Sequence, residues 1–476
     1  MLEGLYAIGR GDNVFEKLKN GIRQVINKLF SKNDIKDATG IGVAISEEMS
    51  NAISLWGAMY EDKAPWVDNN KVKSLNLSAA IASEMARLVT LEMESEITGS
   101  KRAEYLNSQY EKVIEDIRRV TEYACAKGGL IFKPYIDGEN IAVDYVQADL
   151  FFPTKYDFSG NITGCIFVDR KRHGDVIYTR LEHHDLQDTG YYISNKAYKN
   201  VINDGTIGTR IPLTAVDEWK DLEPEALLTN IDKPLFSYLK TPIANTIDTR
   251  SPLGVSVYAR AVSLIEQADR QYSRTLWEYE GGELAINAAA DLFKANGEVP
   301  EGKERLFAML DTDQEDFFKE WAPALRDESF FNGLNKLLQR IEFNCGLAYG
   351  TLSDVQMVDK TATEVKASKQ RTYSTVQDMQ KSLEHALEGL VEAMDIWATL
   401  GNLAPSGDYD ISFEWDDSLA MDAETEMAQM YQEVAAGLIK PEYYLMKRYG
   451  VTEEQLKEMM PNMDEPMDRD DYDDLE

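Results

Sequence analysis

The chain has 476 residues, of which 43% are hydrophobic and 10% aromatic, so a wholly disordered chain is excluded. Lys and Arg number 50 and Asp and Glu number 83, which gives a formal charge of −33. This charge argues against a protein that wraps DNA by neutralising its phosphates, although DNA can still slide over an acidic surface.

The cysteines and the hydropathy of the chain indicate the cellular compartment in which the protein is made. Cys125, Cys165 and Cys345 lie far apart in the sequence and provide neither a disulfide framework nor a paired metal motif, as in proteins of reducing compartments. No apolar run reaches about eighteen residues, so we expect no transmembrane helix. No basic segment followed by an apolar block stands at the N-terminus, so we expect no secretory signal and synthesis in a cytoplasm.

The first part of the chain, residues 1–40, is predicted to be a basic amphipathic arm. Apolar residues recur at helical spacing over 14–31, and lysines and an arginine occupy the other positions. Contact with a membrane surface or a nucleic acid is one interpretation. We favour packing against a neighbouring protein surface.

Residues 40–130 are predicted to be helical. One helix is expected from Ser78 to Glu96 and a second from Arg102 to Ala126. Gly128 and Gly129 follow the second helix, as glycine often does past a helix C-terminus.

From Leu130 to about Leu213 the hydrophobic period falls to two, which predicts an antiparallel sheet of five to seven short strands. Asp137-Gly138 and Ser159-Gly160-Asn161 have the composition of hairpin turns. Pro234, Pro242 and Pro252 then mark a connector.

The second half is predicted to be mainly helical. Helices are expected from Gly254 to about Tyr279, over Phe331–Ala348, over Ala362–Leu400, and at Ala423–Ala436 and Thr452–Met459. Strands are expected at Glu283–Asn287, Glu304–Leu310, Asp316–Trp321 and Tyr409–Trp415. The acidic segment Asp464–Glu476 is predicted to be disordered or a solvated interaction tail.

No motif of reaction chemistry stands out. Gly297 to Lys303 has the spacing of a phosphate-binding loop, but Glu304 stands where Ser or Thr would hold Mg²⁺, so we favour a turn in a β-rich segment. His183 and His184 are adjacent and would point to opposite faces of a strand, so a solvated strand end is favoured over a metal site. We expect no catalytic residue, no metal site and no cofactor.

Absence of an organised site favours a structural component over an enzyme. Two other classes stay open at this point. One is a hydrolase with two acidic residues that converge in a pocket near the 130–213 sheet. The other is a non-catalytic protein that assists the assembly of a larger particle, either a scaffold, which would be more uniformly helical, or an adaptor, which would be shorter.

A collinear series of segments resembles the portal proteins of tailed bacteriophages, in the branch from phages of Gram-positive hosts. The series covers residues 50–460 and consists of Leu55–Tyr60, Ala64–Trp66, Leu75–Leu77, Ser83–Leu88, Gly128–Tyr135, Asp144–Asp149, Phe152-Pro153, Gly190–Asn195, Pro234–Phe236, Asn245–Asp248 and Ser251–Gly254.

The resemblance implies an α+β portal architecture. A helical wing with an antiparallel β-region would occupy 41–250, with helices at 41–128 and the sheet at 130–215. A two-helix stem would occupy 251–280 and 331–349, with a small β-containing clip at 281–330 between them. A tunnel loop at 350–361, a long wing helix and strand at 362–415, a short helical crown at 416–460 and a disordered acidic tail at 461–476 would complete the chain.

The resemblance also implies the function and the partners, and in its light the scaffold or adaptor alternative would be another head-morphogenesis protein. About twelve identical subunits would form a ring at one capsid vertex, with a central channel for double-stranded DNA. The implied partners are the terminase large subunit, head-completion or adaptor proteins, and the major capsid and scaffolding proteins. No membrane is implied; the ring would be assembled in the host bacterial cytoplasm and reside in the virion.

Three groups of site residues follow from this alignment with the family. The tunnel loop would contain Asp354, Val355, Gln356, Met357, Val358, Asp359 and Lys360. Lys366 and Lys369 are weaker candidates to face DNA, and solvated helix-end cations are the plainer alternative for each lysine. Lys294, Lys303 and Arg305 would lie in the clip and contact the terminase.

Overall fold

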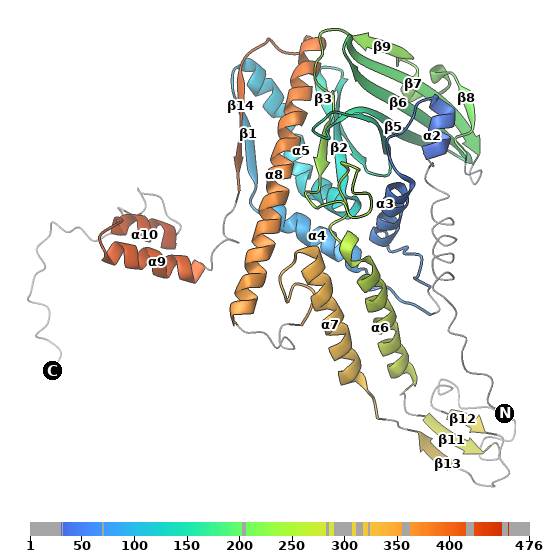
Figure 1. Cartoon of the computed structure of the whole chain (residues 1–476), viewed down its shortest axis with the longest axis vertical. Helices are drawn as coiled ribbons and strands as arrows, with labels where there is room; N and C mark the ends of the chain where they lie inside the picture. Colours follow the sequence, from blue (N-terminus) through green and yellow to red (C-terminus); the bar gives the residue numbers. More distant parts are fainter. Residues whose placement is uncertain are drawn as a thin grey trace, which may run out of the picture. The chain divides into compact units, whose positions relative to one another are not determined.

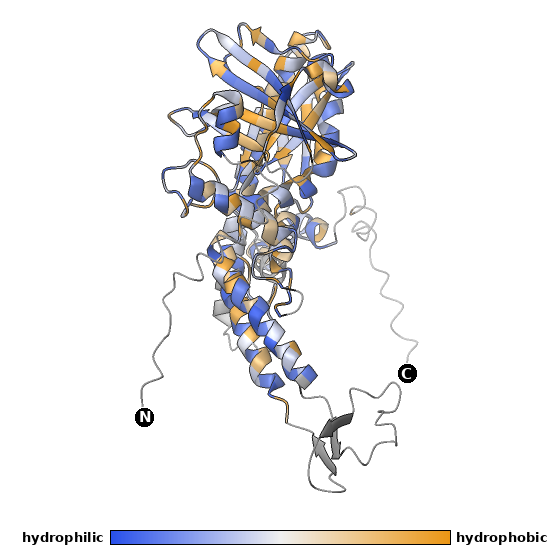
Figure 2. Cartoon of the chain, turned by 90° about the vertical axis from the view of Figure 1, so that its right-hand side faces the viewer, coloured by the Kyte–Doolittle hydropathy of each residue, from blue (hydrophilic) through white to orange (hydrophobic). Residues whose placement is uncertain are grey.

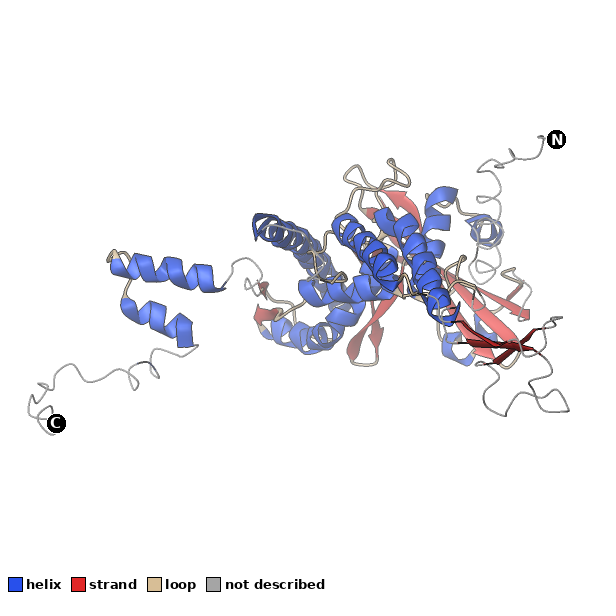
Figure 3. Ribbon diagram, turned by 90° about the horizontal axis from the view of Figure 1, so that it is seen from below, coloured by secondary structure: helices blue, strands red, loops and turns tan. Residues whose placement is uncertain are grey.

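The computed structural model describes residues 30, 32–68, 71–201, 206–281, 285–289, 307–310, 318–321, 324–354, 362–415, 423–449 and 456. Helices and strands are both abundant in these residues, and the fold is α+β (Figure 3). The chain divides into two compact units, Met1–Trp415 and Asp416–Glu476. Among the described residues, no helix is both long enough and apolar enough to cross a bilayer.

Within the described residues, the first helices of the first unit are α2 (Lys32–Thr39), α3 (Glu47–Tyr60), α4 (Leu77–Val89) and α5 (Lys101–Lys127). Their ends follow local chemistry. The side chain of Ser46 caps α3 and that of Ser100 caps α5, each by accepting a hydrogen bond from a first-turn N–H. Gly128, with φ of 90°, ends α5 as predicted.

The predicted helix from Ser78 to Glu96 is wrong over its last part. Helix α4 ends at Val89, and residues Glu94–Gly99 form strand β1. This strand pairs antiparallel with β14 (Tyr409–Glu414), so that Ile97 lies opposite Ile411. Glu92 adopts φ of 50° between the helix and the strand. The partner strand is more than 300 residues away, and helical periodicity in a local window carries no information about it.

The β-region contains two antiparallel sheets where a single sheet was predicted. Strands β10 (Ser237–Lys240), β2 (Gly129–Asp137) and β3 (Asn140–Gln147) form the smaller sheet in that order. The larger sheet has the order β4 (Phe151–Tyr156), β5 (Ile162–His173), β6 (Val176–Gln187), β7 (Gly190–Val201) and β8 (Thr209–Ile211), and β9 (Glu225–Leu228) also pairs with β7. Short 3₁₀ turns follow β8 at Leu213–Ala215 and Asp217–Trp219.

Apolar packing covers the larger sheet. Ile35 of α2 and Phe30 lie in one buried cluster with Phe152, Ile166 and Leu181 of the sheet, and Figure 1 shows α2 beside strands β5 and β6. A second cluster places Trp219 against Ala197 of β7. The segment between the predicted sheet and Pro252 therefore contributes strands β9 and β10 and the buried Trp219, which complete the two sheets.

The Gly-Gly segment after α5 packs directly against Gly254. A Cβ atom on Gly254 would lie 2.1 Å from the carbonyl oxygen of Gly128, and one on Gly128 would lie 2.6 Å from the carbonyl oxygen of Gly254. Thr241 donates its hydroxyl at this junction, 2.6 Å from the Val255 oxygen. The backbones approach so closely that only glycine fits.

Helix α6 (Val262–Gly281) begins later than predicted. Residues 251–258 are not helical, and a 3₁₀ turn at Ala259–Ala261 precedes the helix. The N–H of Val257 donates to the Cys125 carbonyl at 3.0 Å. Val255 and Tyr258 are buried, and the Tyr258 hydroxyl donates to the Trp56 carbonyl of α3, so their apolar spacing reflects burial and not a helix.

Three strands and two long helices follow α6. Strand β11 (Ala285–Ala289) pairs parallel with β12 (Phe307–Leu310) and antiparallel with β13 (Phe318–Trp321). Helix α7 (Asp327–Cys345) is next, and Gly346 in the left-handed conformation ends it. Helix α8 runs over Ala362–Leu400, as predicted, and packs along β10 and β2, where the Ser237 hydroxyl donates to the Ala386 carbonyl.

The second unit contains α9 (Ala423–Ala435) and α10 (Pro441–Tyr449), which pack against each other. The first helix was predicted, but α10 was not, since Gly437 to Pro441 indicated a break and not a new helix start. A proline is well placed at the first position of a helix. Of the predicted helix Thr452–Met459, only Leu456 is described, and it is helical and buried.

Candidate functional site

Helices α6 and α7 form a hairpin whose two arms pack side by side (Figures 1 and 3). Their inward positions hold Ile265 and Ala268 on α6 and Leu334 and Ile341 on α7, all buried. A further contact is the hydrogen bond from the Gln271 side chain to the Phe330 carbonyl at 3.4 Å. The three strands β11–β13 are inserted in the sequence between the two arms.

Asp269 anchors α6 to the segment that precedes α4. Its carboxylate accepts hydrogen bonds from Trp66 Nε1 and from the Leu75 N–H, each at 2.8 Å. Asp269 is 2% exposed, and burial raises the pKa of its carboxyl above the usual 3.8. The contact is a fixed link between the hairpin and the α3–α4 region.

An ion pair joins the two arms at the end nearest the inserted strands. Arg326 Nε donates to Glu278 Oε1 at 2.9 Å and Arg326 Nη2 to Glu278 Oε2 at 2.7 Å. These two hydrogen bonds lower the pKa of Glu278. The paired geometry holds together the positions where the chain leaves and re-enters the hairpin.

At the other end, α7 is followed by a turn that its own side chains hold. The Glu342 carboxylate accepts from the backbone of Leu352 and of Ser353, and the Asn335 side chain bonds the backbone of Asp354. The chain therefore leaves α7 along a defined path as far as Asp354.

The hairpin exposes aromatic side chains on its outer surface. Trp277 of α6 is 67% exposed, and Phe331 and Phe343 of α7 are 41% and 48% exposed. Figure 2 shows hydrophobic segments interspersed with hydrophilic ones along both helices. The sequence predicted these two helices but did not predict which of their aromatic side chains stay exposed, because local spacing does not specify what covers each face.

The predicted site residues are placed only in part. Asp354 and Lys369 are exposed, and Lys366 lies in α8. Val355, Gln356, Met357, Val358, Asp359 and Lys360 of the predicted tunnel loop lie outside the described residues, as do Lys294, Lys303 and Arg305 of the predicted clip. The expected basic arm, apart from its C-terminal end, and the acidic tail also lie outside them.

The structure adds three exposed cations on the hairpin. Arg274 lies on α6, and Lys336 and Arg340 lie one turn apart on α7. Their spacing of four residues places the last two on one face of the helix.

The predicted solvated histidines are instead buried in the middle of β6. His184 is 2% exposed and His183 is 7% exposed. They point to different sides of the strand, as alternation requires: His184 contacts Tyr191 and Phe167, whereas His183 lies near Thr154. The expectation of a strand end was wrong because β6 runs on to Gln187 and pairs on both edges.

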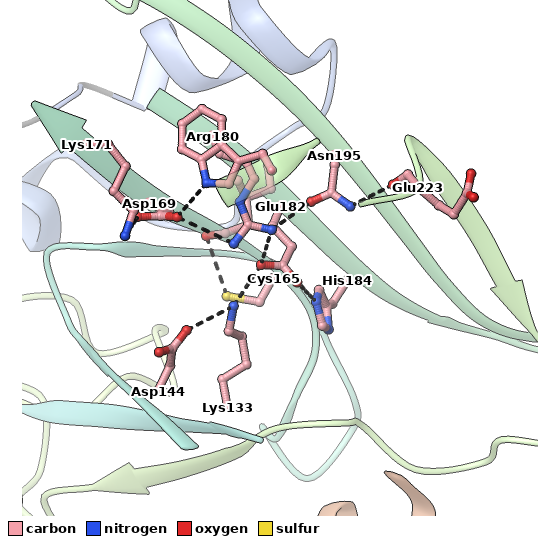
Figure 4. A network of polar contacts seen from close by, with 12 residues as sticks. Lys133, Asp144, Cys165, Asp169, Lys171, Arg180, Glu182, His184, Asn195 and Glu223 are labelled. Atoms are coloured by element: carbon pink, nitrogen blue, oxygen red, sulfur yellow. Dashed lines mark hydrogen bonds and ion pairs between the residues drawn. The ribbon is translucent and has the colours of Figure 1, made fainter. Parts of the chain in front are cut away.

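Glu182 is the centre of a charged network that joins the two sheets (Figure 4). Its carboxylate contacts Lys133 Nζ of β2 at 2.7 Å, His184 Nε2 at 2.9 Å and Arg180 Nη1 at 3.2 Å. Although burial alone acts in the opposite direction, Lys133 and the hydrogen bond from His184 hold the pKa of Glu182 well below its usual range. Because three donors already occupy the Glu182 carboxylate, we interpret this residue as a structural link between the sheets and not as a general base.

A small pocket beside β4 gathers two carboxylates, Glu47 and Asp149. Its volume of about 120 Å³ is well below the roughly 300–1,000 Å³ of typical ligand sites. Lys127 also forms a 2.7 Å ion pair with Asp149. In the described part of the chain, no group of three or more His, Cys, Asp or Glu side chains is arranged to hold a metal ion. The hydrolase hypothesis therefore gains no support.

A comparison with models of protein families identifies the family of this chain. The model of the family described as phage portal protein, SPP1 Gp6-like, matches residues 32–465, and the chain belongs to that family. Members of the family are structural components of the virion capsid. No curated protein sequence matches the chain.

Proposed function

We propose that about twelve copies of this chain form a closed ring at one vertex of the capsid, around a channel through which double-stranded DNA enters and leaves. In this proposal α6 and α7 are the stem, β11–β13 belong to the clip, and the first unit up to β10 is the wing. Helix α8 and β14 complete the wing, and α9 and α10 form a short crown.

The observation that carries the proposal is the exposed aromatic surface of the hairpin. Trp277 of α6 is 67% exposed in the single chain, and Phe331 and Phe343 of α7 stay 41% and 48% exposed although Tyr279 and Arg371 contact their rings. Burying a large aromatic side chain is worth about 1.5–3 kcal/mol. A ring of identical subunits offers each hairpin two lateral neighbours, which supply that burial through one repeated contact.

The charge of the chain fits a channel that does not grip DNA. Each subunit brings a formal charge of −33, so phosphates are repelled from most of the surface and counterion release contributes little. The cations proposed to meet the phosphates are Lys360 in the tunnel loop, with Lys366 and Lys369 near the start of α8. Arg274, Lys336 and Arg340 on the stem are additional candidates.

The proposed partners follow from the same arrangement. The clip, with Lys294, Lys303 and Arg305, would dock the terminase large subunit during packaging and head-completion or adaptor proteins afterwards. The wing and crown would face the major capsid and scaffolding proteins, and assembly would take place in the host bacterial cytoplasm.

Ring formation is tested by native mass spectrometry and negative-stain imaging of the purified full chain. The wild-type protein is expected to form rings, and Trp277→Glu is expected to weaken them at equal concentration by placing a charge in the lateral contact. Phe158→Glu is the matched control, because Phe158 is fully exposed in the turn between β4 and β5. A wild-type protein that stays monomeric under all conditions, even with procapsid proteins present, contradicts the proposal.

A further inference from the structure

Glu342 is an unusual residue for its position. It lies near the C-terminal end of α7, and its side chain is completely buried. In the described part of the chain no ion pair to Glu342 exists. A buried carboxylate that lacks a cation is costly unless hydrogen bonds replace the lost water.

Three hydrogen bonds replace that water, and all come from one short segment. The backbone N–H groups of Leu352 and Ser353 donate to Glu342 Oε1 at 2.6 and 2.8 Å. The Ser353 hydroxyl donates to Oε2 at 2.9 Å. The same hydroxyl oxygen accepts from the Gly350 N–H at 3.2 Å. The carboxylate thus binds the turn itself and not a neighbouring helix.

Asn335 grips the next residue of the same segment. Its Oδ1 accepts from the Asp354 N–H at 2.8 Å, and its Nδ2 donates to the Asp354 carbonyl at 3.4 Å. Asn335 is 7% exposed, and it lies seven residues, or two turns, before Glu342 on the same face of α7. Two side chains of one helix therefore hold two successive points of the chain that departs from it.

The helix that carries this clamp is itself fixed to α8. A Cβ atom on Gly346 would lie 2.8 Å from the Thr375 hydroxyl, so α7 and α8 meet closely at the end of α7. The Arg371 guanidinium lies over the Phe343 ring at 4.4 Å from its centre. The departing segment therefore starts where the end of α7 meets α8.

We propose that Glu342 and Asn335 are positioning residues: they hold Leu352–Asp354 against α7 and so fix the start of the segment that DNA packaging requires next to the stem. This inference rests on the proposed channel function. Neither residue touches DNA in this proposal. Their role is to fix where and in which direction the chain leaves the stem.

The test compares two substitutions at Glu342. Glu342→Leu removes every acceptor and leaves the N–H groups of Leu352 and Ser353 without their partner. Glu342→Gln keeps a carbonyl oxygen at the Oε1 position, so both backbone hydrogen bonds remain. Glu328→Leu is the matched control, since it removes the same charge from an exposed position in the first turn of α7.

Two readouts are measured on assembled full-length rings and on procapsids that carry them. Hydrogen exchange of the Leu352 and Ser353 amides is expected to accelerate about tenfold to a hundredfold in Glu342→Leu. Each amide loses a hydrogen bond to a charged group, and such bonds contribute more to stability than bonds between neutral groups. DNA packaged per capsid is expected to fall in Glu342→Leu, with the ring mass unchanged. Glu342→Gln and Glu328→Leu are expected to behave like the wild type in both readouts.

Faster exchange with normal packaging, or unchanged exchange, would overturn the inference. Asn335→Ala keeps the test decisive if Glu342→Leu fails to assemble, because it removes only the two bonds to Asp354, and it is expected to reduce packaging in intact rings. Normal packaging by Asn335→Ala rings would then refute the positioning role. Failure of the wild type to form rings would instead refute the proposed function, so the two failures are distinguishable.

Discussion

The close approach of Gly254 to Gly128 predicts that a larger side chain at position 254 lowers the free energy of unfolding. In Gly254→Ala the new Cβ would lie 2.1 Å from the Gly128 carbonyl oxygen and 2.7 Å from the Thr241 hydroxyl. An ordinary carbon–oxygen contact is more than about 1 Å longer than the shorter of these distances, so the two backbone segments must separate. Overpacking costs about 1–3 kcal/mol, and this case belongs at the upper end because the obstacle is backbone.

That separation would also strain the hydrogen bonds at the junction. The Gly254 N–H donates to the Tyr238 hydroxyl at 3.1 Å, and the Thr241 N–H donates to the Gly128 carbonyl at 3.3 Å. We therefore expect Gly254→Ala to lose about 3 kcal/mol of unfolding free energy or more.

The assay is thermal and urea denaturation of the full chain, with Gly42→Ala as the control. Nothing lies within 4 Å of a Cβ built on Gly42, and its φ is not in the left-handed region. That substitution is expected to be neutral or to stabilise by less than about 1 kcal/mol. Equal melting temperatures for Gly254→Ala and Gly42→Ala would refute the view that this junction is rigid and close-packed.

Three further predictions concern the stem and its ends. Because burial raises the pKa of Asp269, the folded state binds its proton more tightly, so this group's contribution to stability is greatest below pH 3.8 and falls as the pH rises through the raised pKa. Urea titrations between about pH 3.5 and about pH 6 should therefore show the wild type losing unfolding free energy relative to Asp269→Asn as the pH rises. A difference in unfolding free energy that stays constant with pH would contradict this reasoning. Deleting Val355 to Asp359 should spare ring assembly but impair DNA packaging or retention; normal packaging would show that the tunnel loop is misplaced. Charge reversal at Lys294 and Lys303 should weaken terminase binding in a pull-down with assembled rings, and unchanged binding would count against the clip assignment.

Local patterns predicted much of the secondary structure because it depends on neighbours in the sequence. The bounds of Ala362–Leu400 agree with the structure, since a long apolar stripe with charged residues between is readable within a few turns. Gly128 as the end of α5 is equally local, because it needs only a residue that tolerates positive φ.

Contacts between distant segments decided the rest. Strand β1 exists because β14 lies beside it, and His184 of β6 is buried because Tyr191 of β7 and Phe236 contact its ring. The local sequence around each of these residues is ordinary, and its burial depends on segments that lie far away in the chain. The clamp at Glu342 is the same kind of feature: a lone glutamate beside an apolar stripe carries no local signal of its partners.

The amino-acid sequence alone therefore determined the class of protein, the α+β composition and the order of helix, inserted strands and helix, since these depend on periodicity and on collinear segments. Only the tertiary structure decided which aromatic residues of the hairpin face outward, which carboxylates are buried and what they bind. The physical reason is that burial and hydrogen bonding belong to pairs of segments, and the spacing of residues within one segment does not specify its partner.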